Sequence, residues 1–270
     1  MKICSGLFGG LAMASVIGMG IGVARADTIL WIDDSSGVIG TVDVNTHAVN
    51  VIGNTGLGSN LTDLGFTASG NLYSTTFTGL YSINQSNAAA TFLGNYSVGD
   101  SGMNGMVGSG ANLLASSNAT AEVYSVSPGA PGSATNYAPS PGVSAGDLAF
   151  GPGGLFESVI DPSNGFDALA DINTDTIIGD FTGDLTALFG LTYSNGVMYG
   201  IDGTEVYSVD VATAGLTPLF NYSGSGLGAA NGAAVLGEAV PEPSSLPLLL
   251  AGLGLIGGTF FFGRKKAMAA

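Results

Sequence analysis

The segments LYSINQSNAAATFLG (residues 80–94) and VYSVDVATAGLTPLF (residues 206–220) align with each other without a gap. Each begins with an alternation of apolar and polar residues around a Tyr-Ser pair, which is typical of a β-strand, and continues through a turn into a second strand. Three further segments fit the same frame: GTVDVNTHAVNVIG (40–53), AEVYSVSPG (121–129) and ALADINTDTIIG (168–179). The chain therefore contains five copies of one strand pair.

These copies recur at a nearly constant period. The apolar residue two positions after the tyrosine position has spacings of 41, 43, 46 and 37 residues and stands at Val42, Ile83, Val126, Ile172 and Val209. A second phrase precedes four of the copies, as in DLGFTASGNLYS (63–74) and LFGLTYSNGVMYG (188–200), and reads as strand, tight turn and strand. Four short antiparallel strands in about 40–45 residues are typical of a β-propeller blade.

Two incomplete copies stand at the ends of the repeat region. TILWIDD (28–34) occupies the second-strand position of the first copy, and NGAAVLG (231–237) resembles a first strand with nothing after it. Joined, they make one whole blade and close the ring without open sheet edges. We therefore expect an all-β, five-bladed propeller of four-stranded antiparallel blades over residues 27–239. The alternative is a β-sandwich or solenoid built from the same hairpins, which would not need the fixed period or the two half-copies.

Both ends of the chain carry signals for export. Residues 1–26 combine a base, an apolar stretch and an Ala-x-Ala sequence, which predicts a signal peptide that signal peptidase cuts between Ala26 and Asp27. Residues 246–263 are eighteen uncharged, mostly apolar residues, about the minimum for a transmembrane helix. The three bases that follow, Arg264, Lys265 and Lys266, are expected to stay cytoplasmic. Both signals place the repeat region outside the inner membrane.

The C-terminal segment 240–270 also matches a known pattern. Val240 is followed by Pro241-Glu242-Pro243, an apolar span and a basic end, and this order resembles the PEP-CTERM sorting signal of exported Gram-negative bacterial proteins. The resemblance implies an exosortase as processing partner, cutting near Pro241-Glu242-Pro243 after transient anchoring in the inner membrane. It also implies a final location at the cell surface or outside the cell, in an organism that makes extracellular polysaccharide. The signal is an address and carries no information about activity.

Charge and missing residue types restrict the function of residues 27–239. This segment has no Lys, Arg or Cys, one histidine (His47), and nineteen of the twenty acidic residues, because only Glu242 lies beyond it. Nucleic-acid binding depends on Lys and Arg contacts to phosphate, so we exclude it. The absence of cysteine excludes thiolate nucleophiles, disulfides and zinc-thiolate sites. Chemistry based on carboxylates, with or without a bound cation, remains.

One equivalent position in the predicted first strands carries short oxygen-bearing side chains in four of the five copies. Alignment of the first strands places Asp63, Asn104, Asp147 and Asn231 at this position, with Leu188 in the remaining copy. First strands line the central channel of a propeller, and side-chain oxygens of Asp and Asn are suitable calcium ligands. We therefore predict a cation site, with calcium as the candidate cofactor, or a sugar-hydroxyl site at the channel mouth. The alternative is that these residues only cap turns.

Three functions are compatible with these features. The first is a secreted or surface-displayed, non-enzymatic propeller that binds exopolysaccharide or a surface protein in a biofilm matrix. The second is a carbohydrate-active enzyme, because two carboxylates suffice for glycoside cleavage. The third is an acidic coat or spacer protein without a ligand. We favour the first and assign no catalytic residue.

Overall fold

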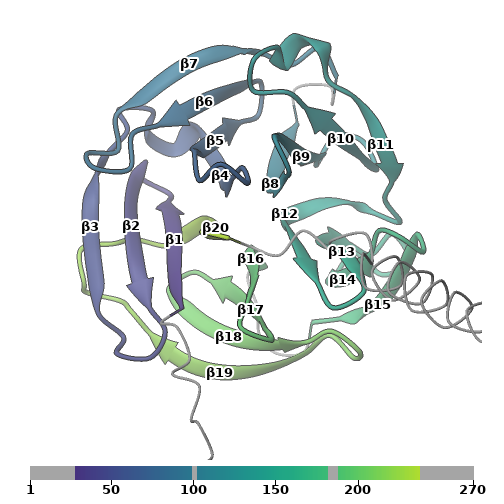
Figure 1. Ribbon diagram of the computed structural model, residues 1–270. Helices are drawn as coiled ribbons and strands as arrows, with labels where there is room; N and C mark the ends of the chain where they lie inside the picture. Colours follow the sequence, from purple (N-terminus) through teal and green to yellow (C-terminus); the bar gives the residue numbers. More distant parts are fainter. Residues whose placement is uncertain (1–27, 99–101, 182–187, 238–270) are drawn as a thin grey trace, which may run out of the picture.

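The computed structural model describes residues 28–98, 102–181 and 188–237. These residues form twenty β-strands in five four-stranded antiparallel sheets, arranged as blades around a common centre (Figure 1). The predicted all-β, five-bladed propeller is thereby confirmed. Two short 3₁₀ turns, Gly58–Asn60 and Pro131–Ser133, are the only helical segments in the three described ranges.

The blades are numbered here from the one that contains the first strand of the chain. Blade 1 is built from β20 (Ala230–Val235), β1 (Ile29–Asp34), β2 (Val38–Asp43) and β3 (Val49–Asn54). Blade 2 contains β4 (Leu61–Phe66), β5 (Leu72–Thr76), β6 (Gly79–Ile83) and β7 (Ala90–Asn95). Blade 3 contains β8 (Met103–Ser109), β9 (Asn112–Ser117), β10 (Glu122–Val126) and β11 (Thr135–Pro139).

The other two blades follow in the same order along the chain. Blade 4 contains β12 (Val143–Gly151), β13 (Gly154–Ile160), β14 (Asp167–Asp171) and β15 (Thr176–Asp180). Blade 5 contains β16 (Leu188–Ser194), β17 (Val197–Asp202), β18 (Glu205–Asp210) and β19 (Gly215–Asn221). The innermost strands are β20, β4, β8, β12 and β16, and the outermost strands form the rim (Figure 1).

Blade 1 closes the ring as the two half-copies predict. Strand β20 pairs antiparallel with β1, with Leu30 opposite Val235 and Trp31 opposite Ala234. The last strand of the described chain is thus the innermost strand of the first blade. This pairing replaces two open edges near the channel by one complete sheet.

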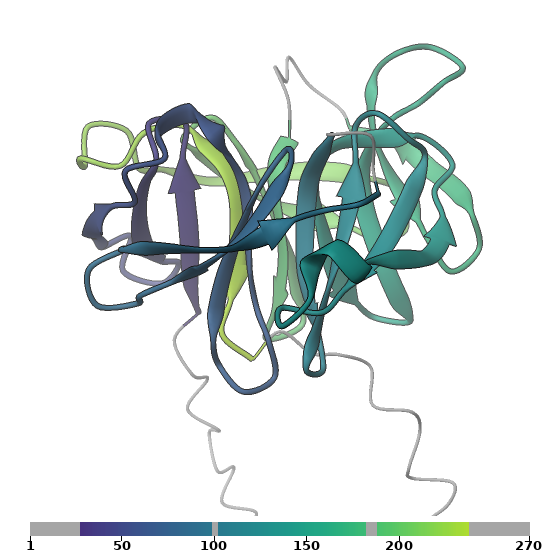
Figure 2. The ribbon, with the colours of Figure 1, turned by 90° about the horizontal axis from the view of Figure 1, so that it is seen from above.

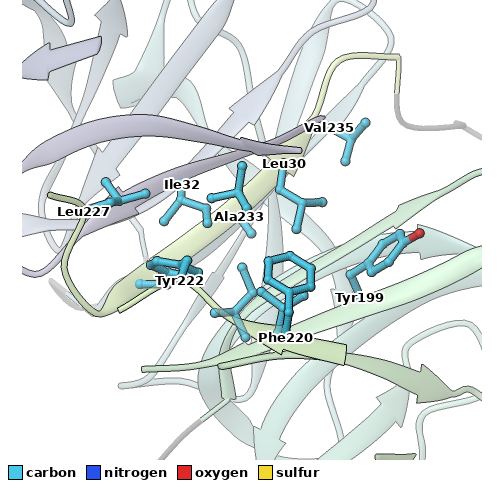
Figure 3. Packing of buried hydrophobic residues seen from close by; sticks show 12 residues of the cluster. Leu30, Ile32, Tyr199, Phe220, Tyr222, Leu227, Ala233 and Val235 are labelled. Carbon is cyan, nitrogen blue, oxygen red and sulfur yellow. The ribbon is translucent and has the colours of Figure 1, made fainter. Parts of the chain in front are cut away.

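The hydrophobic core consists of five separate clusters, one in each interface between neighbouring blades. Between blades 1 and 5, Leu30 and Ile32 face Tyr199 and Phe220 (Figure 3). Alternate residues of a strand point to opposite faces of its sheet. Because each blade has a neighbour on both faces, both sets of residues carry apolar side chains. The ring of His47 in the β2–β3 turn adds a stacking contact to Phe220 at the same interface, with ring centroids 4.2 Å apart.

The two faces of the ring differ in whether the innermost strands begin or end there. Each innermost strand begins at one face and ends at the other, where a tight turn leads into the next strand. Asn195 and Gly196 form such a turn with positive φ values of 51° and 86°, as expected for Asn-Gly in a hairpin. Asn195 donates a hydrogen bond to Thr28 at 2.9 Å, so the first described residue lies at this face. Strand β20 runs antiparallel to β1 and ends at this face, because Val235 lies opposite Leu30. In Figure 2 the start of β1 (purple) and the end of β20 (yellow-green) lie on the same side.

The predicted signal peptide (1–26), with its cleavage site, and the C-terminal segment 240–270 lie outside the described residues, as does the predicted helix 246–263. Within the three described ranges, no helix has the length and apolar character needed to span a bilayer.

Candidate functional site

Every innermost strand contains a β-bulge near its start. The pairing register shifts between Leu61 and Asp63 in β4, between Met103 and Gly105 in β8, and between Ser144 and Leu148 in β12. It shifts again between Leu188 and Gly190 in β16 and opposite Asn231 in β20. A bulge turns the side chain of an unpaired residue away from the regular alternation. The bulges place one residue of each blade in a single pocket: Thr62, Asn104, Ala145, Phe189 and Asn231.

The pocket lies at the centre of the face opposite Thr28 and has a volume of about 610 Å³. Its two aromatic side chains, Phe77 and Phe189, are 42 % and 38 % exposed. The remaining lining is polar or aliphatic: Asn104, Asn118, Asn231, Ser59, Thr62, Ser144, Leu61, Val143, Ala145 and Ile160. No described residue that lines the pocket carries a charge. Aromatic surface beside uncharged donors and acceptors suits a neutral polar ligand with an apolar face.

Two of the pocket amides are held in place by hydrogen bonds to a neighbouring blade. Asn231 donates through Nδ2 to the carbonyl oxygen of Leu61 at 2.8 Å, and Asn104 donates through Nδ2 to that of Ser144 at 3.4 Å. The Oδ1 atom of Asn104 is buried and has no hydrogen-bond partner among the described residues. The Asn104 side chain is only 8 % exposed. This acceptor thus lies behind the pocket surface, where neither solvent nor a ligand in the pocket reaches it.

Three fully buried carboxyl groups, those of Asp33, Asp63 and Asp147, lie below the pocket and are called the carboxyl cluster here. Asp63 accepts hydrogen bonds from the backbone N–H of Leu64 and, in blade 3, of Met106. The carboxyl groups of Asp63 and Asp147 are hydrogen-bonded to each other.

Asp147 extends this network to the remaining blades. It accepts hydrogen bonds from the N–H of Leu191 in blade 5 at 2.8 Å and of Ala233 in blade 1 at 3.1 Å. Together with the contacts of Asp63, in blade 2, these bonds connect all five blades through two side chains. They also satisfy backbone N–H groups that the bulges leave without a strand partner.

Asp33 completes the carboxyl cluster from β1. Its Cα lies opposite Gly232 of β20, and a Cβ at Gly232 would collide with Oδ1 of Asp63. Both carboxyl oxygens of Asp33 are buried without a hydrogen-bond partner of good geometry in the described part of the chain. The missing side chain at Gly232 therefore provides the space in which Asp63 reaches the centre.

The carboxyl cluster holds protons near neutral pH. Burial, and then the negative charge of Asp147, raise the pKa of Asp33 to about 8 and the pKa of Asp63 well above its usual value. Burial also raises the pKa of Asp147 to about 7, against the lowering effect of the hydrogen bond from Asp63. No Lys or Arg occurs in residues 28–237 to offset these charges. We therefore interpret Asp63 as the protonated partner that donates to Asp147.

A fourth buried acid, Glu157 of β13, lies near the pocket side of the cluster. It accepts a hydrogen bond from the Ser140 hydroxyl at 2.7 Å, and burial raises the pKa of its carboxyl group to about 7. Ser144, which lines the pocket, also interacts with this carboxyl group. Glu157 itself does not line the pocket.

The structure divides the four residues predicted for a channel-mouth site into two pairs. Asn104 and Asn231 line the pocket, whereas Asp63 and Asp147 belong to the carboxyl cluster below it. The predicted single level is not observed, because the bulges fall at different positions in the five first strands and shift the side chains relative to an ungapped alignment. Leu188, at the fifth position, is buried in the interface with blade 4.

Among residues 28–98, 102–181 and 188–237, no group of three or more His, Cys, Asp or Glu is arranged to hold a metal ion. The calcium site at Asp63, Asn104, Asp147 and Asn231 stays a prediction.

Sequence reasoning missed the aromatic lining and two buried acids, Asp33 and Glu157. Phe77 and Phe189 carried no repeat signal, because they stand in a loop and at a bulge, which the repeat alignment does not define. Asp33 carried a signal that could have been used, since it directly follows the apolar residues of TILWIDD (28–34), and an acidic residue in a buried strand is unusual.

Comparison with known proteins identifies the C-terminal segment. Residues 239–266 match the PEP-CTERM protein-sorting motif, in agreement with the sequence-based assignment. The motif implies export, a surface or extracellular location and processing by an exosortase. The comparison with curated protein sequences finds no match to this chain.

Solved structures with a similar fold share little sequence with the chain. A chain of a nidogen/laminin complex is 13 % identical, with a TM-score of 0.48 and coverage of 79 % of this chain and 86 % of that chain. A gluconolactonase from Xanthomonas campestris is also 13 % identical, with a TM-score of 0.48 and 72 % coverage of both chains. A protein of unknown function from Bacteroides caccae is 13 % identical, with a TM-score of 0.46 and coverage of 78 % and 99 %. The fold and the motif together identify the chain as an exported, surface-sorted five-bladed β-propeller protein that carries a PEP-CTERM sorting motif at residues 239–266.

Proposed function

We propose that the exported propeller is a non-enzymatic binding protein of the cell surface or extracellular matrix, and that it holds exopolysaccharide in the pocket formed by the five bulges. The observation that carries this proposal is the combination of two exposed phenylalanine rings with uncharged amide and hydroxyl side chains in one pocket. A sugar offers C–H faces for the rings and hydroxyl groups for the polar side chains.

The uncharged polar lining gives a physical reason to prefer a ligand with hydroxyl groups. A polar group that loses its water without gaining another partner costs about 1–3 kcal/mol. A ligand hydroxyl can replace that water at the amide and hydroxyl side chains of the lining, whereas an apolar ligand cannot.

The position of the pocket suits binding at a surface. Thr28 and the end of β20 lie at one face of the ring, because Thr28 accepts a hydrogen bond from Asn195 and Val235 lies opposite Leu30, and the pocket opens at the other face. The sorting motif begins two residues after Gly237. The pocket thus opens on the side away from the tether, so ligand access does not depend on removal of the tether.

The placement of the acids supports binding rather than glycoside cleavage. Cleavage needs carboxyl groups within hydrogen-bond reach of the scissile bond. Asp63 and Asp147 are 0 % exposed and their oxygens accept backbone hydrogen bonds. No described residue in the pocket lining can donate or accept a proton near neutral pH.

The proposal is tested with the full chain, purified in detergent, and the exopolysaccharide of the producing organism. We expect binding without release of reducing ends, and a loss of binding of about tenfold or more in the double variant Phe77→Ala/Phe189→Ala. Tyr137→Ala is the matched control, because Tyr137 is also half-exposed, at 51 %, but lies on the outermost strand of blade 3. Release of reducing ends would point to the enzyme alternative, and the absence of binding to the coat or spacer alternative.

The same titration, repeated with calcium and with a chelator, tests the predicted cation site. A calcium-dependent rise in melting temperature that disappears in Asn104→Ala/Asn231→Ala would support calcium at the channel mouth, because these two ligands can be removed without touching the carboxyl cluster.

A further inference from the structure

We infer that the propeller binds a neutral glycan chain at a second surface, made of two neighbouring side depressions on the face that carries Thr28. One depression lies between blades 1 and 2 and the other between blades 2 and 3, and each has a volume of about 460 Å³. The inference rests on the proposed function for the class of ligand. The site itself is separate, because no described residue lines both a side depression and the pocket formed by the bulges, called the central pocket here.

The two side depressions are built from equivalent residues of consecutive blades. In blade 1, Trp31 of β1 lies opposite Thr41 of β2, and both line the first depression. In blade 2, Tyr73 of β5 lies opposite Ser82 of β6, and both line the second. Residues that lie opposite each other on neighbouring strands share one face of the sheet. Each depression therefore combines an aromatic side chain with an adjacent hydroxyl group.

The same position is covered in the other three blades. The equivalent pairs there are Leu114 with Ser125, Phe156 with Asp171 and Tyr199 with Ser208. The side chains on the second strands of these blades are 1 %, 5 % and 6 % exposed, because the next blade packs over them. Trp31 and Tyr73 are partly exposed instead. Aromatic surface is thus left open at two consecutive interfaces, at a position that the fold can bury.

One turn of blade 2 borders both side depressions. Gln85, between β6 and β7, lines each of them and donates through Nε2 to the carbonyl oxygen of Gly70 at 2.7 Å. This bond fixes the orientation of the amide. The ring of Trp31 is also held in place, by an edge contact to the ring of Phe66 with centroids 5.5 Å apart. Groups that are ordered before a ligand arrives lose less entropy on binding.

The side depressions and the central pocket lie at opposite faces of the ring. Ile29, which lines the first depression, directly follows Thr28. Gln85 and Pro128 stand in the turns after β6 and β10, which correspond to the turn after β2 and lie at the face where β1 begins. The central pocket opens at the other face. One propeller can therefore hold two chains at once, which makes it a cross-linker of polysaccharide.

The charge distribution favours a neutral ligand at the side depressions. Their described lining residues carry no charge at neutral pH. Most exposed acids lie between Asp161 and Asp210, in blades 4 and 5, whereas the described part of blades 1 to 3 contributes Asp43 and Glu122. An anionic ligand would find no Lys or Arg in residues 28–237 to replace its hydration. A cationic ligand would be attracted to the acids of the other half of the ring.

A glycan fits two equivalent sites side by side because it repeats. Its rings offer C–H faces to the aromatic side chains and hydroxyl groups to Thr41 and Ser82, at regular intervals along the chain. Both depressions share Gln85, so consecutive parts of one chain can occupy them in turn. Two linked contacts bind much more tightly than either contact alone, which allows two open depressions to hold a polymer.

Cross-linking tests the second surface, with the full chain in detergent and the neutral fraction of exopolysaccharide from the producing organism. We expect the wild type to cross-link long chains, seen as maximal turbidity at an intermediate ratio of protein to polysaccharide. Turbidity should disappear in Trp31→Leu/Tyr73→Leu, while the central pocket still binds. Asn136→Ala, which changes an exposed amide of β11 outside both depressions, is the control and should keep the turbidity. Full turbidity in Trp31→Leu/Tyr73→Leu would overturn the inference.

A second set of variants isolates the side depressions and separates the two proposals. In Phe77→Ala/Phe189→Ala, which removes the aromatic lining of the central pocket, we expect residual binding of neutral chains by isothermal titration calorimetry. Adding Gln85→Ala should weaken this binding about threefold or more, and it changes only an exposed turn residue, so it decides the matter if Trp31→Leu/Tyr73→Leu does not fold.

The outcomes of this set differ for the two proposals. Complete loss of binding in Phe77→Ala/Phe189→Ala alone would overturn the second surface and leave the proposed function intact. Unchanged binding in that variant, together with loss in Trp31→Leu/Tyr73→Leu, would refute the central pocket and support the side depressions. Absence of binding by the wild type would overturn both.

Discussion

Asp63 and Asp147 hydrogen-bond to each other across the centre of the propeller, although 84 residues and one whole blade separate them in the chain. Each also accepts backbone hydrogen bonds from another blade. Blades of a propeller contact mainly their neighbours through apolar side chains, whereas the hydrogen bonds of these two acids also join blades that are not adjacent in the ring. The stability of the centre therefore depends on two polar side chains and their protons.

Asp147→Asn tests the role of this centre. The variant keeps the size of the side chain but replaces one acceptor oxygen by an NH₂ group, so that either the N–H of Leu148 or those of Leu191 and Ala233 lose their acceptor. We expect the free energy of unfolding to fall by about 3 kcal/mol, measured by urea denaturation. Asp175→Asn is the control, because Asp175 is exposed in a turn with φ of 53° that Asn tolerates. Equal stability of both variants would show that Asp147 does not stabilise the fold.

Stability should decrease as the pH rises from about 5 to 8.5. The folded-state pKa values of Asp33, Asp147 and Glu157, at about 8, 7 and 7, are raised above their ordinary values. Their stabilising contribution is complete below the unfolded-state pKa and is lost as the pH rises through the folded-state pKa. We expect the melting temperature to fall by about 5 °C or more over this range. At the acid end, exposed acids with lowered pKa, such as Asp43 and Asp210, act in the opposite direction.

Asp33→Asn should reduce this pH dependence. Burial raises the pKa of Asp33 to about 8, and its carboxyl group has no hydrogen-bond partner of good geometry among the described residues that an amide would lose. The neutral amide resembles the protonated acid, so we expect wild-type stability at pH 5 and higher stability than wild type at pH 8.5. Melting curves at the two pH values check this. A variant that keeps the full wild-type slope would show that Asp33 does not titrate in this range.

Gly232→Ala tests the space that the carboxyl cluster requires. The added Cβ would meet Oδ1 of Asp63 and displace that carboxyl group from the centre. Overpacking of this kind costs about 1–3 kcal/mol, and the lost hydrogen bonds of Asp63 add to it. Gly129→Ala is the control, because a Cβ at Gly129 meets nothing within 4 Å. We expect a clear drop in the urea midpoint for Gly232→Ala and almost no change for Gly129→Ala.

The closing strand sets a limit on where the chain can be cut. A chain that ends at residue 239 retains β20, whereas one that ends at residue 229 loses the innermost strand of blade 1 and the Ala233 hydrogen bond to Asp147. We expect the longer form to show cooperative unfolding by circular dichroism and the shorter form to be unfolded or aggregated. Cooperative folding of the shorter form would mean that the ring does not need its C-terminal closure.

The fold could be predicted from the sequence because local, repeated patterns of residues indicate its strands and turns. The Tyr-Ser strand, the Asn-Gly and Ser-Gly turns and the period near 42 residues each report on neighbouring residues, and the incomplete copies at both ends indicated the pairing of β20 with β1. The sorting motif is likewise a local pattern of proline, apolar and basic residues. Such features can be recognised in a single sequence, because each depends on the conformation of residues that are close together in the chain.

The candidate site depends on tertiary structure. The same sequence alignment that located Asp63 and Asn104 in equivalent strands placed them at one level, but the bulges turn Asn104 into the pocket and leave Asp63 in the centre below it. A shift of one residue in a strand moves a side chain to the other face, and no local pattern shows in which strand the shift occurs. The repeats in the sequence therefore determined the ring of blades and its closure, and the sorting motif indicated export of the protein. Only the packing of five bulged strands around one axis decided which acids share protons and which residues form the pocket.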